Sequence, residues 1–242
     1  MNKYGLVGRN IDYSFSKKYF TQKFENENIE ATYENFDITS ISDFKKIIQQ
    51  NKKLSGLNVT TPYKEKVIPF LDELDPQAKT IGAVNTIQFI KGKLIGHNTD
   101  GFGFVKSIFT HIENHHDKAL VLGSGGASKA IVNGLKSMSI ESTVVSRNPS
   151  EKQISYKDIT KEVIDEHFLI INCTPVGTHP NDSECPDIPY KYLSDRHFLY
   201  DLVYNPAMTK FLALGNQKGA KITNGSQMLA YQAERAWQLW NE

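Results

Sequence analysis

The chain has 242 residues, of which 39% are hydrophobic, and its 28 basic and 27 acidic residues leave a formal net charge of +1 at pH 7. Such a chain can bury a core in one large domain or two modest ones, and its balanced charge argues against a surface that attracts nucleic acid or anionic lipid. We therefore expect a small-molecule partner, with no nucleic acid and no membrane involved. The sequence has no signal-peptide pattern, no long apolar run and only two cysteines, so the cytoplasm is the expected compartment.

The first hundred residues alternate between patterns typical of strands and of helices. Strands are expected over 4–8, over 32–38 and in a short stretch that ends before Pro62, and a hairpin is expected over 83–90 and 93–96. Helices are expected over 17–26, over 41–50 with Ser40 or Ser42 as its cap, and over 101–109. The alternation predicts an α/β fold.

Four polar residues in this part have both a structural and a functional interpretation. Ser14 and Ser16 would point the same way from an extended loop, although Ser16 could simply cap the helix that follows. Lys64 comes after a proline turn at an expected helix start, where a cation is unfavourable, yet an isolated lysine is usually a surface residue. Asp100 is a good N-cap for the next helix, and its place between the two halves of the chain leaves a second role open.

A glycine-rich segment, Gly123-Ser124-Gly125-Gly126-Ala127-Ser128, follows the apolar run 119–122. This is the pattern of a buried strand that leads through a phosphate-binding turn into a helix. Gly123 would permit the tight turn, Gly125 would let backbone N–H groups approach a pyrophosphate, and the small residues after them would let the helix pack closely. The anion would then lie at the positive end of the helix. The alternative is a tight turn without a ligand.

The next expected strand, 142–146, ends in Ser146-Arg147-Asn148, about 20 residues after the first glycine, where NAD enzymes usually place an acid. A guanidinium beside hydroxyl and amide donors suits a 2′-phosphate, whereas a carboxylate would repel it. Arg147 therefore favours NADP over NAD. The alternative is a solvated surface arginine.

The remaining segments continue the α/β pattern to the end of the chain. Helices are expected over 128–138, 158–166, 209–218 and 226–239, and strands over 168–172 and 197–203. Gly219 would end the third of these helices. Thr174 follows a strand at the edge where open α/β sheets bind ligands. The last helix has one apolar face, and Gln232 lies off that face, as a surface glutamine would.

Seven segments, taken together, resemble the shikimate dehydrogenase family, the NADP-dependent enzymes of aromatic amino-acid and chorismate biosynthesis. They are Ser14-Phe15-Ser16, Asn58-Val59-Thr60-Thr61-Pro62-Tyr63-Lys64, Gly82-Ala83-Val84-Asn85-Thr86, Asn98-Thr99-Asp100-Gly101, Gly123 to Ser128, Asp201-Leu202-Val203-Tyr204-Asn205-Pro206, and Asn224-Gly225 through Met228-Leu229 to Gln232-Ala233. They occur in the family's order over nearly the whole chain.

The resemblance implies a two-domain oxidoreductase that reduces 3-dehydroshikimate to shikimate with NADPH and without a metal. Residues 1–100 with 226–242 would form an α/β substrate-binding and catalytic domain, and 101–225 a Rossmann-like NADP-binding domain. Lys64 and Asp100 are the implied catalytic pair. The implied substrate-binding residues are Ser14, Ser16, Asn58, Thr60, Asn85, Tyr204 and Gln232. The implied cofactor-binding residues are Gly123, Ser124, Gly125, Gly126, Ala127, Ser146, Arg147, Asn148, Thr174, Leu202 and Gly225.

Alternatives remain at this level. Tyr13 and Lys17 differ from the usual family residues, and the second basic residue that often follows Arg147 is not in its usual place, so the preference for NADP could be weaker. A quinate/shikimate dehydrogenase using NAD is one alternative, and a dinucleotide-binding sensor without catalysis is another. The presence of both Lys64 and Asp100 favours an enzyme, which we expect to be a monomer or a homodimer.

Overall fold

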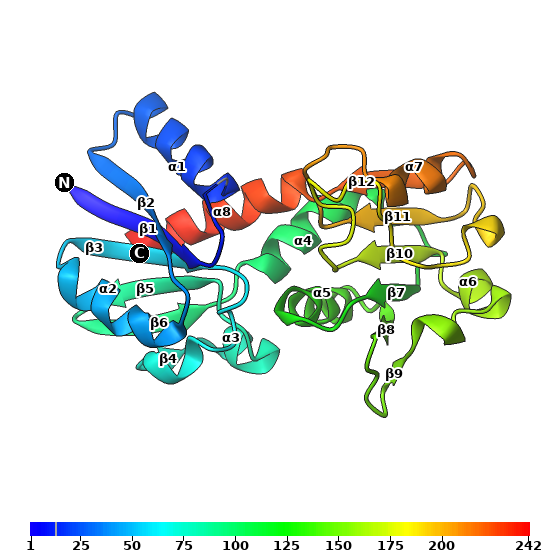
Figure 1. Cartoon of the computed structure of the whole chain (residues 1–242), viewed down its shortest axis with the longest axis horizontal. Coiled ribbons are helices and arrows are strands. Elements are labelled where there is room, and N and C mark those ends of the chain that lie inside the picture. The colour runs from blue at the N-terminus through cyan, green and yellow to red at the C-terminus, as the bar shows by residue number, and fades with distance from the viewer. Residues whose placement is uncertain (13) are drawn as a thin grey trace. The chain divides into compact units, whose positions relative to one another are not determined.

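The computed structural model describes residues 1–12 and 14–242, so the departure from the family pattern at Tyr13 lies outside the described residues. The chain forms two compact units (Figure 1). Unit 1 comprises Met1–Gly103 and Leu229–Glu242, and unit 2 comprises Phe104–Met228. Two helices, α4 (Asp100–Ile108) and α8 (Ser226–Asn241), carry the chain across these boundaries.

Unit 1 contains a six-stranded sheet in the order β2-β1-β3-β5-β6-β4. The strands are β1 (Asn2–Gly8), β2 (Ala31–Asp37), β3 (Leu54–Val59), β4 (Glu73–Leu74), β5 (Thr86–Ile90) and β6 (Lys93–His97). β1 runs parallel to β2 and β3, whereas β5 is antiparallel to both β3 and β6. The carboxyl ends of β1, β3 and β6 therefore meet the amino end of β5 at one edge of the sheet.

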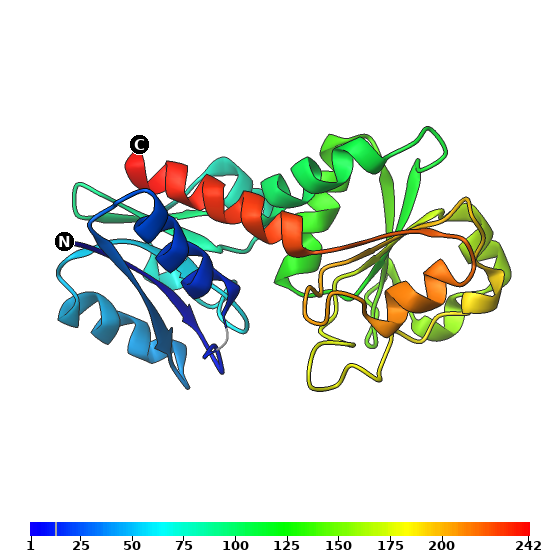
Figure 2. The same ribbon diagram turned by 90° about the horizontal axis from the view of Figure 1, so that it is seen from above.

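Helices cover both faces of this sheet. On one face α1 (Phe15–Asn26) and α8 pack their apolar stripes together, and Figure 2 shows the two helices side by side. On the other face lie α2 (Phe44–Gln50) and α3 (Pro76–Ile81). The expected apolar face of the last helix is confirmed, because Ala233, Ala236 and Trp240 belong to the buried cluster beneath α1.

Close backbone contact fixes the position of α8. A Cβ added at Gly56 of β3 would lie 2.4 Å from the indole of Trp240, so no larger residue fits without displacing the ring. The indole nitrogen Nε1 of Trp240 donates to the Ile87 carbonyl at 3.1 Å, which satisfies its only donor. The last helix, from Leu229 onwards, is thus an integral part of unit 1.

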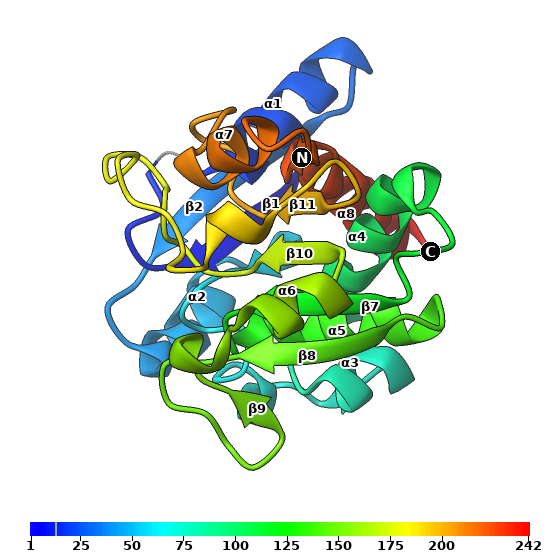
Figure 3. The same ribbon diagram turned by 90° about the vertical axis from the view of Figure 1, so that its right-hand side faces the viewer.

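Unit 2 contains six parallel strands in the order β12-β11-β10-β7-β8-β9 (Figure 3). They are β7 (Lys118–Leu122), β8 (Glu141–Val145), β9 (Gln153–Ile154), β10 (Leu169–Asn172), β11 (Phe198–Asp201) and β12 (Lys221–Asn224). Numbered within the unit, this order is 3-2-1-4-5-6, which is the order of a Rossmann fold. The core strands β7 and β10 are fully buried from Ala119 to Leu122 and from Leu169 to Asn172, as a parallel sheet covered on both faces requires.

The layers of unit 2 follow from two apolar clusters, one on each face of the sheet. α4 and α5 (Gly126–Ser137) pack on one face, and α6 (Lys161–Glu166) and α7 (Lys210–Asn216) pack on the other. Short 3₁₀ helices complete the chain: η1 (Ile41–Asp43), η2 (Ile68–Phe70), η3 (Phe109–His111), η4 (Tyr156–Asp158) and η5 (Tyr190–Tyr192). Among the described helices, none has the length and apolarity needed to cross a membrane.

Several expected helix starts are wrong. α1 begins at Phe15, and its cap is Ser14, whose Oγ accepts from the Lys17 N–H at 3.3 Å. Ser14 has the extended backbone that a cap requires, so Ser16 lies in the first helical turn and the two serines do not share an extended loop. At the expected cap Asp100, α4 has already begun.

Other expected boundaries also shift. Lys64 lies in a turn and not at a helix start, since only η2 follows and Pro69 within it has no N–H to continue an α-helix. α7 ends at Asn216, before Gly219, and α5 begins at Gly126, earlier than expected. The hairpin is confirmed, although β5 begins only at Thr86. Four further elements, α3, β4, β9 and β12, were not expected from the sequence.

Candidate functional site

The expected catalytic pair lies at the edge of the unit 1 sheet where the strand ends meet. Lys64 Nζ donates to Asp100 Oδ2 at 2.6 Å, and the two side chains are 17% and 7% exposed. The turn that carries Lys64 is anchored by the buried side chains of Tyr63 and Val67, and the Lys64 carbonyl accepts from the Val84 N–H at 2.8 Å. A largely buried lysine side chain is therefore held beside a carboxylate at the rim of the sheet.

Asn85 fixes the other side of this carboxylate. Its Nδ2 donates to Asp100 Oδ1 at 2.9 Å, while its Oδ1 accepts from the Thr99 N–H at 2.8 Å. An amide that must accept from a backbone N–H has its orientation determined, so its NH₂ faces Asp100. One carboxylate oxygen of Asp100 thus accepts from Asn85, and the other accepts from Lys64.

Gln232 belongs to the same cluster and is not the surface glutamine that its place off the apolar face of the helix would suggest. The side chain is only 5% exposed, and its Oε1 accepts from Asn85 Nδ2 and from Thr99 Oγ1, each at 3.3 Å. Its own NH₂ donates to the Leu229 carbonyl at 3.0 Å. α8 therefore contributes a buried polar side chain to the edge formed by β3, β5 and β6.

A second chain of hydrogen bonds extends the cluster towards α1. Tyr33 of β2 donates from its hydroxyl to Asn58 Oδ1 at 2.8 Å, and Asn58 Nδ2 donates to Thr86 Oγ1 at 3.2 Å. Burial raises the pKa of Tyr33, an effect that a hydrogen bond with Ser16 partly opposes. Asn58 and Ser16, both expected to bind substrate, are thereby linked through one buried phenol.

The other expected substrate residues are placed as follows. Ser14 Oγ donates to Asn35 Oδ1 at 3.0 Å, and the Thr60 backbone pairs with Val7 and Tyr63 at the end of β3. Tyr204 lies in unit 2, after β11, and is 37% exposed. Unit 1 thus brings together Ser14, Ser16, Asn58, Thr60, Lys64, Asn85, Asp100 and Gln232 at one edge of its sheet.

Four members of this cluster were not assigned a role from the sequence: Tyr33, Asn35, Thr86 and Thr99. Thr86 and Thr99 lie inside the segments that resemble the family, so the sequence could have identified them as candidate site residues. Tyr33 and Asn35 alternate along β2, and a strand with polar side chains at this period has one polar face. Their partners, Asn58 of β3 for Tyr33 and Ile11 and Ser14 for Asn35, lie elsewhere in the chain, and the sequence pattern alone does not identify them.

The expected cofactor residues lie at the carboxyl ends of the parallel strands of unit 2. The glycine-rich segment follows β7, Ser146 to Asn148 follow β8, Thr174 follows β10, Leu202 follows β11 and Gly225 follows β12. Since parallel strands end at the same edge, all of these residues lie along one edge of this sheet. The order of strands reverses between β7 and β10, and dinucleotides bind at that point in such sheets.

The glycine-rich segment has the geometry of a phosphate-binding turn. Gly123 has φ +106°, which side chains rarely adopt, and its N–H bonds the Val145 carbonyl at 2.8 Å. Gly125 is the N-cap of the twelve-residue α5, whose first turn has no acidic residue, and a Cβ added there would meet no atom within 4 Å. An open space in front of a helix N-terminus suits a phosphate.

The residues after β8 suit a second phosphate. Ser146 Oγ lies 3.1 Å from Ser124 Oγ and accepts from the Asn148 N–H at 3.3 Å, which ties the glycine-rich segment to the turn that carries Arg147. Arg147 is exposed, and no acid occurs in Ser146-Arg147-Asn148. The donors present fit NADP.

A buried acid supports the same edge of unit 2. Asp201, at the end of β11, accepts from Asn172 Nδ2 at 2.9 Å, from the Val203 N–H at 3.0 Å and from Thr209 Oγ1 at 2.6 Å. Burial raises its pKa to about 6, although the three donors oppose the rise. These bonds fix the turn after β11 and the start of α7, which Thr209 caps.

Within residues 1–12 and 14–242, no three His, Cys, Asp or Glu side chains are grouped as a metal ion would require. The chemistry available in unit 1 is a lysine and carboxylate pair within a set of amide and hydroxyl groups. Such a set can hold a polyhydroxylated ligand and transfer a proton.

Comparison with known proteins identifies the family. A model of the shikimate dehydrogenase substrate binding domain matches residues 6–87. Shikimate dehydrogenase (NADP(+)) of Clostridium botulinum is 38% identical over 247 residues, which cover 98% of this chain and 95% of the relative. The chain belongs to the shikimate dehydrogenase family.

Solved structures of this family have the same fold. The chorismate mutase/shikimate 5-dehydrogenase fusion protein from Clostridium acetobutylicum matches with a TM-score of 0.90 at 34% identity, covering 100% of this chain and 91% of that one. Shikimate 5-dehydrogenase from Thermus thermophilus, solved with NADP(H) and shikimate, matches with a TM-score of 0.88 at 31% identity, covering 99% and 93%. The expected α/β fold with a Rossmann-like domain and the resemblance to the shikimate dehydrogenase family are both confirmed.

Proposed function

We propose that this member of the shikimate dehydrogenase family catalyses the reversible NADPH-dependent reduction of 3-dehydroshikimate to shikimate, a step of chorismate and aromatic amino-acid biosynthesis. The observation that carries the proposal is the ion pair of Lys64 and Asp100, 2.6 Å long, within a cluster of buried amide and hydroxyl groups. Relatives that cover almost the whole chain are named for this activity and for NADP.

Lys64 has the role of proton donor. When bound, NADPH supplies the hydride, and a proton must reach the carbonyl oxygen as the carbon is reduced. Lys64 Nζ is a donor at the rim of the cluster, and Asp100 holds it in one direction. Asn85 in turn prevents Asp100 from rotating, because it occupies the second carboxylate oxygen. In the reverse direction the same lysine accepts the proton of the shikimate hydroxyl.

The amide and hydroxyl groups around this pair bind the substrate. Shikimate has three hydroxyls and a carboxylate, and neutral hydrogen-bond groups suit the hydroxyls because each can donate or accept. We assign this binding to Ser14, Ser16, Asn58, Thr60, Asn85, Gln232 and Tyr204. The carboxylate of shikimate only accepts hydrogen bonds, so it too needs donors among these groups.

We assign the cofactor to unit 2. The turn from Gly123 to Ala127 would hold the pyrophosphate at the start of α5, and Ser146, Arg147 and Asn148 would bind the 2′-phosphate. Thr174, Leu202 and Gly225 would line the neighbouring strand ends. A reducing compartment such as the cytoplasm fits the free thiols of Cys173 and Cys185, where the enzyme would act as a monomer or a homodimer.

One assay tests this function against its alternatives. The purified chain is given shikimate or quinate with NADP⁺ or NAD⁺, and the reduced nucleotide is followed by its absorbance. We expect the highest kcat/KM for shikimate with NADP⁺. A higher value for quinate with NAD⁺ would identify the quinate/shikimate enzyme instead, and nucleotide binding without turnover on either acid would identify a sensor.

A further inference from the structure

β2 carries three polar side chains that hold the segment preceding α1. Tyr33, Asn35 and Asp37 alternate along the strand and so share one face of it. Tyr33 interacts with Ser16, Asn35 bonds both Ile11 and Ser14, and Asp37 Oδ2 accepts from the Ile11 N–H at 3.1 Å. An outer strand of the sheet therefore holds both serines assigned to the substrate.

Asn35 is the central contact of this face. Its Nδ2 donates to the Ile11 carbonyl at 2.7 Å, and its Oδ1 accepts from Ser14 Oγ at 3.0 Å. A carbonyl cannot donate, so the NH₂ must face Ile11 and the oxygen must face Ser14. One amide thus fixes both the backbone at Ile11 and the hydroxyl of Ser14.

The two bonds determine the position of Ser14 at the start of α1. Ser14 Oγ donates to Asn35 and accepts from the Lys17 N–H, so the hydroxyl is held from the strand side and the helix side at once. Without Asn35 only the bond to Lys17 would remain of these two, and Ser14 could adopt other rotamers. A ligand would then have to order the serine itself, at an entropic cost.

We propose that Asn35 is a positioning residue of the substrate site, which acts through Ser14: it takes the only proton of this serine and so fixes Ser14 Oγ as an acceptor for a substrate hydroxyl. The proposal rests on the function proposed above. It assigns to β2 a role in substrate affinity and none in the chemical step, because Asn35 bonds Ile11 and Ser14, whereas Lys64 and Asp100 bond each other.

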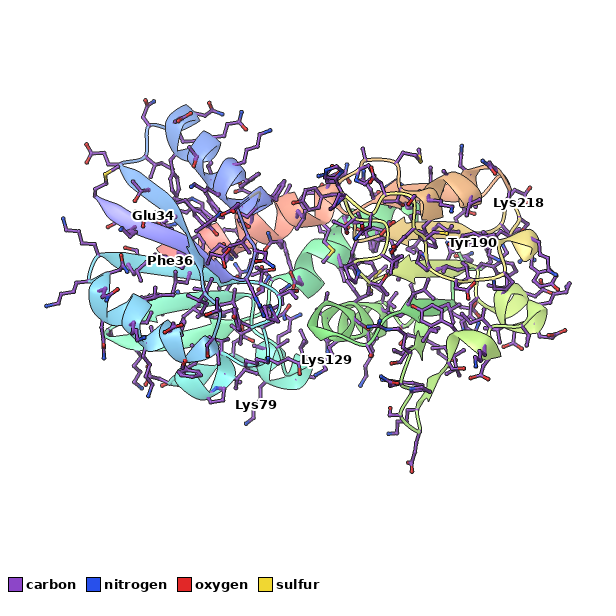
Figure 4. All side chains as sticks on the ribbon, in the orientation of Figure 1. Glu34, Phe36, Lys79, Lys129, Tyr190 and Lys218 are labelled. Carbon is purple, nitrogen blue, oxygen red and sulfur yellow. The ribbon has the colours of Figure 1, made fainter. Side chains whose placement is uncertain are left out.

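The test is the Asn35→Ala variant, with Glu34→Ala as its matched control. Glu34 is the preceding residue of β2 (labelled in Figure 4), its side chain pairs with Lys3 at 2.9 Å, and alternation places it on the other face of the strand. We expect Asn35→Ala to raise both the KM and the calorimetric Kd for shikimate about threefold to tenfold, the usual value of one or two hydrogen bonds. The kcat and the KM for NADP⁺ should stay within about twofold, and Glu34→Ala should change none of these values.

A double-mutant cycle separates positioning from a general loosening of unit 1. If Asn35 acts through Ser14, the loss of affinity caused by Asn35→Ala should be much smaller in a Ser14→Ala background. Equal losses in both backgrounds, or an unchanged or lower Kd in Asn35→Ala, would overturn the proposal. Should Asn35→Ala fail to fold, Asn35→Ser provides the same comparison with a side chain too short to span both partners. Turnover of shikimate by the wild type tests the proposed function separately, since the ratio of Kd values is measured without turnover.

Discussion

Lys64 is the residue on which the proposed chemistry depends most directly. Lys64→Ala removes the donor but leaves Asn58, Asn85 and Gln232 in their bonds, so the substrate should still bind. We expect kcat to fall by about 10²-fold to 10⁴-fold, the usual scale of general acid–base catalysis, with a much smaller change in KM for shikimate. Steady-state kinetics of the purified variant give both values. A variant that keeps its kcat and loses only affinity would make Lys64 a binding residue, and the proton carrier would then be Asp100 or a water molecule.

Arg147 is the residue that we expect to select the cofactor. Arg147→Ala removes charge-assisted bonds worth about 1.5–3 kcal/mol each to a 2′-phosphate, so the KM for NADP⁺ should rise by at least about tenfold while the KM for NAD⁺ changes little. Lys152→Ala is the control, because this exposed lysine lies further along the same segment. Equal effects of Arg147→Ala on both nucleotides would make Arg147 an ordinary surface residue.

Asp201 makes the free energy of unfolding of unit 2 depend on pH. Its pKa of about 6 lies above the ordinary value of 3.8 because the carboxyl is buried. The folded state therefore binds the proton more tightly, and this stabilisation is fully present below about pH 4 and lost as the pH rises to about 6. Its full size is on the order of 3 kcal/mol. Asp201→Asn keeps the shape and removes the titration, so urea unfolding between pH 4 and pH 7 should show the wild type losing stability relative to this variant. Parallel pH profiles of the two proteins would contradict the assignment.

At the scale of elements, long apolar patterns in the sequence were sufficient to predict a strand or helix, whereas short ones were not. The buried strands β7 and β10 follow from their continuous apolar runs, and the helix α8 follows from its one apolar face. β4 and β9 have only two residues each, so they carry no period, and they exist because a neighbouring strand offers hydrogen bonds. Helix starts shifted for a related reason, since Ser14 and Ser16 are equally good caps in sequence and only the contact with β2 distinguishes them.

The residues of the candidate site also differ in whether the sequence alone could predict them. Asn58, Asn85 and Asp100 could be proposed from sequence because they lie in segments that resemble the shikimate dehydrogenase family. Tyr33 and Asn35 could not, because an aromatic residue and an amide on an outer strand are unremarkable until Ser16 and Ser14 are placed beside them. Helical periodicity alone favours a surface position for Gln232, because it takes no account of Asn85 and Thr99, which bond this side chain.

The contact between β3 and α8 makes an element-scale prediction. Gly56→Ala places a Cβ 2.4 Å from the Trp240 indole, so the helix or the strand must move. We expect this overpacking to lower the free energy of unfolding by about 1–3 kcal/mol, measured by denaturant unfolding with tryptophan fluorescence. Ser55→Ala, at the neighbouring position on the opposite face of β3, should change stability by less than about 0.5 kcal/mol. Equal stabilities of Gly56→Ala and the wild type would contradict the close packing of α8 against β3 at Gly56.

At the scale of the whole molecule, unit 1 is built from two separate parts of the chain, and unit 2 is continuous. Truncation after Met228 removes Ala233, Ala236 and Trp240 from the core of unit 1 together with Gln232. We expect this shortened chain to lose amide hydrogen-exchange protection in β1, β2 and β3 while β7, β10 and β11 keep theirs. Loss of protection in both units, or in neither, would contradict the independence of unit 2.

The same division imposes an order on biosynthesis. Ribosomes add about 5–20 residues per second, so the time between the end of the first segment of unit 1, at Gly103, and the arrival of Leu229 is on the order of ten seconds. During this interval unit 2 is being synthesised, and Tyr4, Leu6 and Phe20 of unit 1 lack the helix that buries them. The nascent chain should therefore expose an apolar sheet face that molecular chaperones recognise until the last helix is made.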